Sequence, residues 1–342
     1  MTCLHDIEVP NIKRNGDYYL WADYLELLCL LSQDNEVTIN VLDEFMGVDK
    51  GMHIDEDIID DITYFDSTQS DLTTEIFNNS DKISLIYDDL SRIFYTRLSI
   101  FGDKYPFICN INNKTIFNKK EYSYDNLLYI FLLIAGNTRL FKKNFQQNLA
   151  NDFEQLATDA LRIIFPKPWE WRHFGTAKHT TVDSYLGTKY SKLKILSDDI
   201  NAKLIVEECN FSKFDTKDAG FDFVCWYPFD GDRASHLPLV FAQSTCTSNL
   251  DTLIIKQYSV LDDRIKNYFT QICCYNILLT PVFFRDAAGY FTRPHELVSV
   301  IIDRFRIMQL ISYNIKMFTK LNSYCGITNS FPSINEKLYY GK

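Results

Sequence analysis

Positive charge is scarce in the first 100 residues of the sequence, which hold 6 Lys+Arg against 21 Asp+Glu, a net charge of −15. Such a segment repels nucleic acid and favours a protein partner or a second subunit. The rest of the chain carries 29 Lys+Arg against 24 Asp+Glu, a net charge of +5, and residues 139–194 hold 10 basic against 5 acidic side chains. This asymmetry predicts two modules with different electrostatic roles.

Metal-binding cysteine spacing is also missing. None of the nine cysteines belongs to a C-x-x-C pair, and the six histidines show no ligand spacing, which argues against the common zinc motifs. Most of the cysteines lie in apolar stretches, where buried and reduced thiols are the expected state in a cytoplasmic protein.

Further absences narrow the class of protein. The sequence has no G-x-x-x-x-G-K-[ST] loop for ATP phosphates and no G-x-S-x-G nucleophile elbow. It begins without the basic and apolar segments of a signal peptide. Its longest apolar run, residues 127–135, is about half of the roughly 20 residues that a membrane helix needs. We therefore expect a soluble, cytoplasmic protein with no membrane contact.

The hydrophobic fraction of 46% supports a substantial core, and the N-terminal pattern is mostly helical. Two helices, a hairpin and a buried helix are predicted there, in that order, over residues 17–46, 55–100, 105–117 and 123–135. Gly136 and Asn137 fit the C-terminal cap of the last helix. A boundary near residue 145 gives an acidic, mostly helical module (residues 1–145) and a second module (residues 146–342).

The pattern of the second module alternates between helix and strand. Predicted helices cover residues 151–164, 251–275 and 295–319, and predicted strands cover residues 203–207, 221–227, 239–245 and 277–284. Asn151 or Asp152 is expected to cap the first of these helices, and Pro166 is expected to end it. The order helix, strands, helix, strand, helix predicts an α/β fold.

Three oxygen-bearing side chains fall on these elements in an ordered series. Glu154 lies on the first helix, Asp222 at the start of the second strand and Gln243 near the end of the third. If the second and third strands pair as a hairpin, Asp222 and Gln243 share one end of the sheet, and the packed helix can bring Glu154 there. Two carboxylates and an amide oxygen suit Mg²⁺ (or Mn²⁺), which activates water for the hydrolysis of phosphodiesters.

At these residues the chain resembles the restriction-endonuclease-like, or PD-(D/E)XK, nuclease superfamily, and most closely its Mrr-like branch. In that branch a Glu on the first core helix precedes a Gly-x-Asp segment, here Gly220 to Asp222, and a third-strand Glu or Gln, here Gln243. The resemblance covers residues 146–310. It implies a mixed central sheet flanked by helices, and metal-dependent cleavage of DNA (or RNA) with Glu154, Asp222 and Gln243 as catalytic and metal-binding residues. It also implies a role in bacterial restriction or anti-phage defence.

The sequence departs from this family pattern at one position. Where the family carries a lysine two residues after the third-strand Glu or Gln, this chain has Thr245. Threonine has no positive charge with which to stabilise a phosphoryl transition state. Three hypotheses remain. A lysine from elsewhere, such as Lys203 or Lys256, replaces it; the metal acts alone; or the fold persists as a non-catalytic subunit that binds nucleic acid or protein.

The candidates also have purely structural explanations. Glu154 fits a charge near the start of its helix, and Asp222 close to Gly220 fits a turn. Further candidates for phosphate and base contacts lie in or near a basic, aromatic stretch, namely Arg172, His173, Lys189 and Lys192. A loop packed on the core or a solvated helix face explains these four about equally well.

Overall fold

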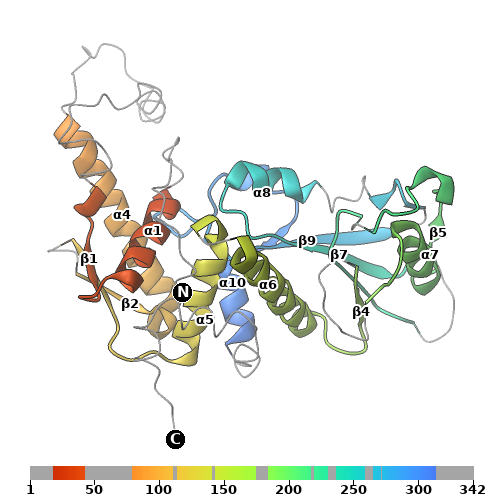
Figure 1. Cartoon of the computed structure of the whole chain (residues 1–342), viewed down its shortest axis with the longest axis horizontal. Coiled ribbons are helices and arrows are strands. Elements are labelled where there is room, and N and C mark those ends of the chain that lie inside the picture. Colours follow the sequence, from red (N-terminus) through yellow and green to blue (C-terminus); the bar gives the residue numbers. More distant parts are fainter. Residues whose placement is uncertain are drawn as a thin grey trace, which may run out of the picture.

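The computed structural model of the chain describes residues 18–42, 79–110, 114–140, 143–174, 184–216, 219–229, 236–258, 265–270 and 272–312. This part has a mixed α/β architecture, as the sequence predicts. Figure 1 shows an elongated molecule, with the N-terminal helices at one end and a twisted sheet at the other. Within these ranges no helix combines the length and the apolarity that crossing a bilayer requires.

In the described residues the N-terminal half combines helices with a small antiparallel sheet. Its helices are α1 (Tyr18–Leu31), α4 (Asn79–Phe101) and α5 (Tyr124–Gly136), and its strands are β1 (Glu36–Thr38), β2 (Phe107–Asn110) and β3 (Thr115–Asn118). The strand order is β1-β3-β2, and both pairs are antiparallel. The hairpin predicted near residues 105–117 is therefore confirmed.

The helix predicted over residues 17–46 is interrupted after Leu31, where α1 ends, and residues 32–40 are not helical. The backbone of Asn35 turns through a positive φ of 58°, and β1 follows it as a strand paired with β3. Residues 43–78, which include much of the second predicted helix, lie outside the described residues and carry 11 of the 21 acidic side chains of the first 100 residues. The predicted partner surface of the acidic module therefore lies largely outside the described part of the chain.

Helix α5 begins and ends as its sequence predicts. The Ser123 hydroxyl accepts a hydrogen bond from the Asn126 N–H, and the Asn126 side chain accepts one from the Ser123 N–H, which makes a capping box. At the other end Asn137 is the C-cap residue, and its N–H donates to the carbonyl of Ile134. All residues from Asn126 to Gly136 are buried, so this helix forms the centre of the N-terminal half.

The C-terminal half is built around a mixed sheet of five strands in the order β10-β9-β7-β6-β4. Its helices are α6 (Lys143–Ile164), α7 (Lys189–Asp199), α8 (Leu250–Gln257) and α10 (Arg304–Ile311). Its strands are β4 (Glu170–His173), β5 (Lys203–Leu204), β6 (Phe223–Trp226), β7 (Pro238–Ser244), β8 (Phe269–Thr270), β9 (Cys273–Leu279) and β10 (Val300–Ile302). Short 3-10 helices occupy Gly102–Lys104, Thr138–Leu140, Glu208–Asn210 and Pro294–Glu296.

The strand directions follow the order of the elements along the chain. Strand β6 pairs antiparallel with both β4 and β7, whereas β7 and β9 pair parallel with α8 in the connection between them. Strand β10 adds a further parallel edge to β9. The antiparallel pairing of the second and third predicted strands is therefore confirmed.

Several predicted boundaries are wrong. Helix α6 begins at Lys143, so Asn151 and Asp152 lie within it and do not cap it. The predicted strand at residues 203–207 is only β5, which pairs with β8 in a separate two-stranded sheet. The helix predicted over residues 251–275 ends early, because β8 and part of β9 occupy the rest of that range. The helix predicted over residues 295–319 starts late, because β10 occupies the first part of its range.

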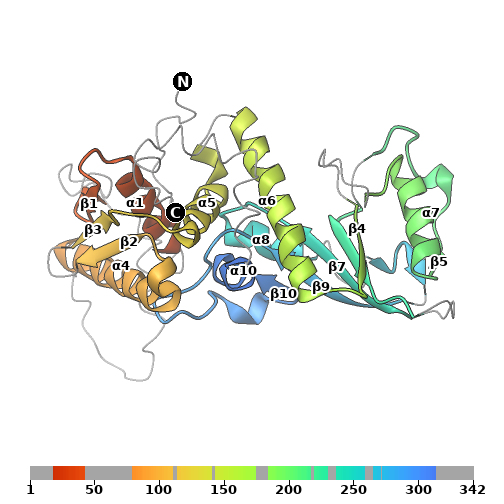
Figure 2. The ribbon, with the colours of Figure 1, turned by 90° about the horizontal axis from the view of Figure 1, so that it is seen from below.

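Helices cover both faces of the five-stranded sheet. Along β7, Val240 and Ala242 belong to the hydrophobic cluster that contains the apolar side of α6, whereas Leu239 and Phe241 belong to a second cluster that contains residues of α7. The cluster on the α6 side also holds residues of α1, α4 and α5, so it extends across residue 145. The predicted module boundary falls in the first turn of α6, which Figure 2 shows lying between the N-terminal helices and the sheet.

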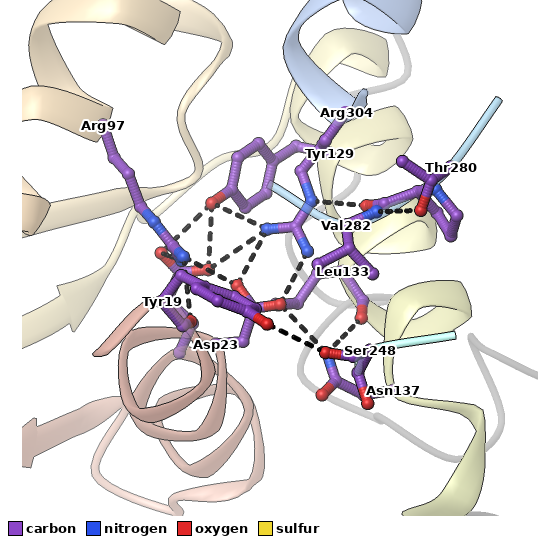
Figure 3. Close-up of polar contacts among 12 residues, drawn as sticks. Tyr19, Asp23, Arg97, Tyr129, Leu133, Asn137, Ser248, Thr280, Val282 and Arg304 are labelled. Atoms are coloured by element: carbon purple, nitrogen blue, oxygen red, sulfur yellow. Dashed lines mark hydrogen bonds and ion pairs between the residues drawn. The ribbon is translucent and has the colours of Figure 1, made fainter. Parts of the chain in front are cut away.

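A buried polar network also joins the two halves (Figure 3). Arg304 of α10 binds the Asp23 carboxylate of α1 through two hydrogen bonds of 3.0 and 2.8 Å. Arg97 of α4 lies 2.8 Å from Asp23 and 2.6 Å from Glu26, and the hydroxyl of Tyr129 donates to Glu26. Burial raises the pKa of Glu26, whereas the charges of Arg304 and Arg97 outweigh burial at Asp23 and lower its pKa.

Candidate functional site

Three strand ends meet at one end of the five-stranded sheet. His173, the last residue of β4, is paired with Phe223, the first residue of β6, and Phe223 is paired with Ala242 near the end of β7. The predicted site residue Asp222 comes directly before β6, and Ser244 ends β7. The register therefore brings the start of β6 and the ends of its two neighbours side by side.

The Asp222 carboxylate is held by the end of β7. Its Oδ2 atom accepts hydrogen bonds from the backbone N–H of Ser244 at 2.8 Å and from the Ser244 hydroxyl at 3.0 Å. The backbone of Asp222 continues the sheet, because its N–H donates to the carbonyl of Ala242 and its carbonyl accepts from the N–H of Phe174. Asp222 is a sheet residue with a fixed carboxylate, and its side chain is 9% exposed.

Glu154 reaches the same end of the sheet from α6. Its Oε1 atom contacts Nε2 of His173, the ring of which packs edge-on against Phe223 at a centroid distance of 5.2 Å. His173 is buried, and the Glu154 side chain retains 15% exposure. The sequence predicted that Glu154 lies near this end of the sheet. It did not predict the contact with His173, which was a candidate for nucleic-acid contacts.

A lysine from another element contacts Thr245. Lys256 of α8 donates a hydrogen bond from its ammonium group to Thr245 Oγ1 at 2.8 Å. Burial raises the pKa of the neighbouring Cys246 thiol to about 12, with Lys256 lowering it and Glu154 raising it further. The Lys256 ammonium is therefore fixed at the end of β7 by its hydrogen bond to Thr245. The other lysine considered, Lys203, lies in the separate β5–β8 sheet.

Gln243 is placed differently from Glu154. Side chains alternate along a strand, so Gln243 follows Phe241 and lies on the face opposite α6, whereas Ser244 follows Ala242 on the α6 face. The expectation that Gln243 shares a face with the helix that carries Glu154 is therefore not met by this alternation. The register that pairs Phe223 with Ala242 puts Asp222 opposite Gln243, so these two predicted residues are neighbours at this end of the sheet.

The predicted nucleic-acid contacts divide into core and surface residues. Lys192 is buried, and its ammonium donates to the carbonyls of Phe174 and Thr216, both at 3.2 Å. Its predicted phosphate contact is wrong, because a buried ammonium with internal acceptors cannot reach a phosphate. Lys189 lies 3.3 Å from the Asp215 carboxylate, and the guanidinium of Arg172 lies over the Trp226 ring at 5.9 Å.

One sequence signal for this site was missed. Trp169, Trp171 and His173 follow one another at a spacing of two, which is the period of a strand with one packed face. The structure has β4 at Glu170–His173, with Trp171 and His173 both turned to α6, where Arg162 and Glu154 contact them. The spacing alone could have identified β4 and the face that carries His173.

The donor chemistry of the sheet end fits a hard divalent cation. Glu154 and Asp222 supply carboxylate oxygens, and Mg²⁺ commonly binds one or two carboxylates while it keeps several waters. Within the described residues there is no group of three or more His, Cys, Asp or Glu side chains arranged around a metal position. The fit therefore depends on the two carboxylates and on water, and it excludes a closed structural site built from the described residues.

Comparisons of the chain with protein families, with curated proteins and with solved structures gave no match. The topology and the residues gathered at the sheet end therefore provide the basis for a function.

Proposed function

We propose that the chain is a metal-dependent nuclease with a restriction-endonuclease-like core that hydrolyses phosphodiester bonds in DNA. The observation that carries the proposal is the position of Lys256, whose ammonium donates to Thr245 Oγ1, in the position where the motif lacks its lysine. The order of elements supports it. Helix α6 is followed by the antiparallel strands β4, β6 and β7, then by α8 and the parallel strand β9.

The proposed roles follow from the contacts. Asp222 and Glu154 would hold Mg²⁺ or Mn²⁺, and the bound metal supplies an activated water and neutralises charge on the phosphate. Ser244 fixes the orientation of the Asp222 carboxylate through two hydrogen bonds, and His173 fixes Glu154. Lys256 would stabilise the negative charge that develops on the phosphate oxygens, which is the role of a preorganised cation in a half-buried site.

The test is a cleavage assay on plasmid and single-stranded DNA with Mg²⁺, Mn²⁺ or EDTA. The wild-type chain is compared with Asp222→Asn and Glu154→Gln, which keep side-chain size but remove the charge. Glu208→Gln is the control, because Glu208 is an exposed acid of the same half. We expect metal-dependent cutting that both site variants lose by at least about 10²-fold, as for the loss of one strong electrostatic contact, and that the control keeps.

A second measurement separates the proposal from its alternative, a nuclease-fold subunit that binds nucleic acid or protein without cutting. Titration of Mn²⁺ into the wild-type chain should show one binding process that Asp222→Asn weakens. Absence of both cutting and Mn²⁺ binding in the wild-type chain would refute the enzyme and favour the subunit. A role in restriction or anti-phage defence is the biological hypothesis that accompanies the enzyme.

A further inference from the structure

A surface groove with a volume of ≈ 550 Å³ lies at the corner where α6 leads into β4. Arg162, Lys167 and Arg172 supply three positive charges to its lining, and Glu170 supplies one negative charge. The rings of Trp169 and Trp171 line it as well. Cations that are mixed with aromatic rings are the combination that recognises both the phosphates and the bases of a nucleic-acid strand.

Aromatic rings continue from this groove in a row. The ring centroids of Phe165 and Trp169 are 4.9 Å apart, those of Trp169 and Tyr227 are 5.7 Å apart, and those of Tyr227 and Phe229 are 5.0 Å apart. Neither neighbour stacks parallel to Trp169, since the interplanar angles are 53° and 84°. The row ends at Phe229, whose side chain is 51% exposed. It runs from a half-buried ring to a solvent-facing ring, as a stacking platform requires.

Two cations of the groove lie over aromatic rings. The guanidinium of Arg162 lies 3.6 Å from the centroid of the Trp171 ring, and that of Arg172 lies 5.9 Å from the centroid of Trp226. These contacts keep two long side chains ordered at the groove, which lowers the entropy lost when they bind a phosphate. Lys167 is exposed in the turn that joins α6 to β4.

The groove lies close to the candidate site. His173 and Trp169 are four residues apart along β4 and its approach, so at about 3.3 Å per strand residue they are about 13 Å apart. Arg162 follows Glu154 by eight residues on α6, which is about 12 Å along the helix axis. A strand whose phosphate lies at the Glu154–His173 contact can therefore place nearby bases in the groove.

We infer that this groove and its aromatic row bind unpaired bases, and that the preferred ligand is single-stranded nucleic acid or a single-stranded end. Bases in a duplex are already stacked on one another, so only unpaired bases can stack on protein rings. The inference depends on the proposed nuclease for its biological meaning, because it names the substrate class of that site. Binding itself needs neither metal nor cleavage.

The test measures the binding of a fluorescein-labelled 12-nucleotide oligo(dT) to the full chain in EDTA, with fluorescence anisotropy as the readout. Trp169→Leu and Phe229→Ser each remove one ring of the row. Each should weaken binding roughly 5- to 150-fold, the effect of losing one stacked base. Tyr290→Ser is the matched control, because Tyr290 is a loop aromatic with 72% exposure that lies outside the row. The Tyr290→Ser variant should bind oligo(dT) with the affinity of the wild-type chain.

Two further readouts make the result decisive. Lys167→Gln should reduce the slope of log K against log salt by about 0.7, the value for one phosphate contact to a single strand. A 12-base-pair duplex should compete at least about 10-fold less well than the oligo(dT). The inference is overturned if the wild-type chain does not bind oligo(dT), if Phe229→Ser binds as the wild type does, or if the duplex competes equally.

The outcomes also separate this inference from the proposed nuclease. Binding that depends on the row, combined with no cleavage in Mg²⁺ or Mn²⁺, would refute the nuclease and support the groove. Metal-dependent cleavage of single-stranded DNA that is unchanged in Trp169→Leu and Phe229→Ser would support the nuclease and refute the groove. Because Phe229 is half exposed, its variant tests the row even if Trp169→Leu fails to fold.

Discussion

Lys256 Nζ lies 2.8 Å from Thr245 Oγ1, although the two residues belong to different elements and are 11 positions apart in the sequence. Thr245 follows β7 directly and is buried, and its N–H donates to the carbonyl of Leu279 in β9. The threonine is thus a fixed acceptor that orients the ammonium from α8. The end of β7 therefore carries a fixed ammonium at Thr245 and a fixed carboxylate at Ser244, that of Asp222, without a lysine in the strand itself.

The contact between Lys256 and Thr245 predicts what happens when the lysine charge is removed and when it is placed at position 245. Lys256→Ala should lower the rate of DNA cleavage about 10²- to 10³-fold, the cost of removing one preorganised donor to a developing anion. Lys203→Ala should leave the rate unchanged, because Lys203 lies in the separate β5–β8 sheet. Adding Thr245→Lys to Lys256→Ala should restore part of the lost activity, and no recovery with an intact fold would argue against a shared position.

The contact between Glu154 and His173 predicts a stability difference between two substitutions. His173→Phe keeps a ring against Phe223 but removes the nitrogen that contacts Glu154. His173→Gln keeps a polar group but loses the ring. If the polar contact dominates, His173→Phe should cost about 1–3 kcal/mol, because it leaves a carboxylate with 15% exposure without its partner. Urea denaturation measures the free energy of unfolding of both variants. A larger loss of stability in His173→Gln would identify ring packing as the main contribution of His173 to stability.

The buried network of Asp23 predicts a large loss of stability. Asp23→Ala should lower the free energy of unfolding by about 3–5 kcal/mol, since it leaves the buried guanidinium groups of Arg97 and Arg304 without their shared carboxylate. Arg92→Ala is the control: it breaks an exposed ion pair with Asp89 and should cost less than about 1 kcal/mol. Similar losses in the two variants, measured by urea denaturation, would contradict the structural role of the network.

The raised pKa of Asp159 predicts that the stability of the protein depends on pH. Burial raises the pKa of Asp159 to about 6, despite the opposing charge of Arg162 at 3.8 Å. An unfolded chain has an Asp pKa of about 3.9, so between about pH 4 and pH 6 the folded chain binds more protons. The contribution of Asp159 to the free energy of unfolding should therefore fall as pH rises through this window, by about 2–3 kcal/mol in total.

The measurement for Asp159 is urea denaturation at several values between pH 4 and pH 7. Asp159→Asn cannot ionise, so the difference in stability between this variant and the wild type should grow in favour of the variant as pH rises. Asp198→Asn is the control, because Asp198 is exposed on α7. A constant difference between Asp159→Asn and the wild type across this range would mean that Asp159 does not titrate in it.

The prediction of elements succeeded where local signals agree. Ser123 and Asn126 form the capping box of α5, and the turn before Thr115 joins two β-type runs, so both elements are specified by residues close together in the sequence. The prediction failed where a strand resembles a helix. Residues 273–275 and 300–302 are strands because β7 and β9 supply the partners with which they pair.

The candidate site was also predictable from the sequence only in part. Asp222 could be chosen from the sequence because an acidic residue within an apolar strand pattern is costly unless it is paired. Glu154 could be chosen only from its place in the ordered series of elements. Their actual partners, His173 and Ser244, depend on the register of β4, β6 and β7, which no local pattern specifies. The contact between Lys256 and Thr245 depends on where α8 lies relative to the end of β7.

The sequence by itself therefore determined the α/β class and the hairpin at residues 105–117, and it singled out Asp222 as a candidate, because each follows from periodicity, turn chemistry or the cost of burying charge. Only the tertiary structure decided that Lys192 is buried, that Gln243 faces away from α6 and that Lys256 lies at Thr245. These depend on contacts between residues far apart in the chain, which form only when strand register and helix packing are fixed together.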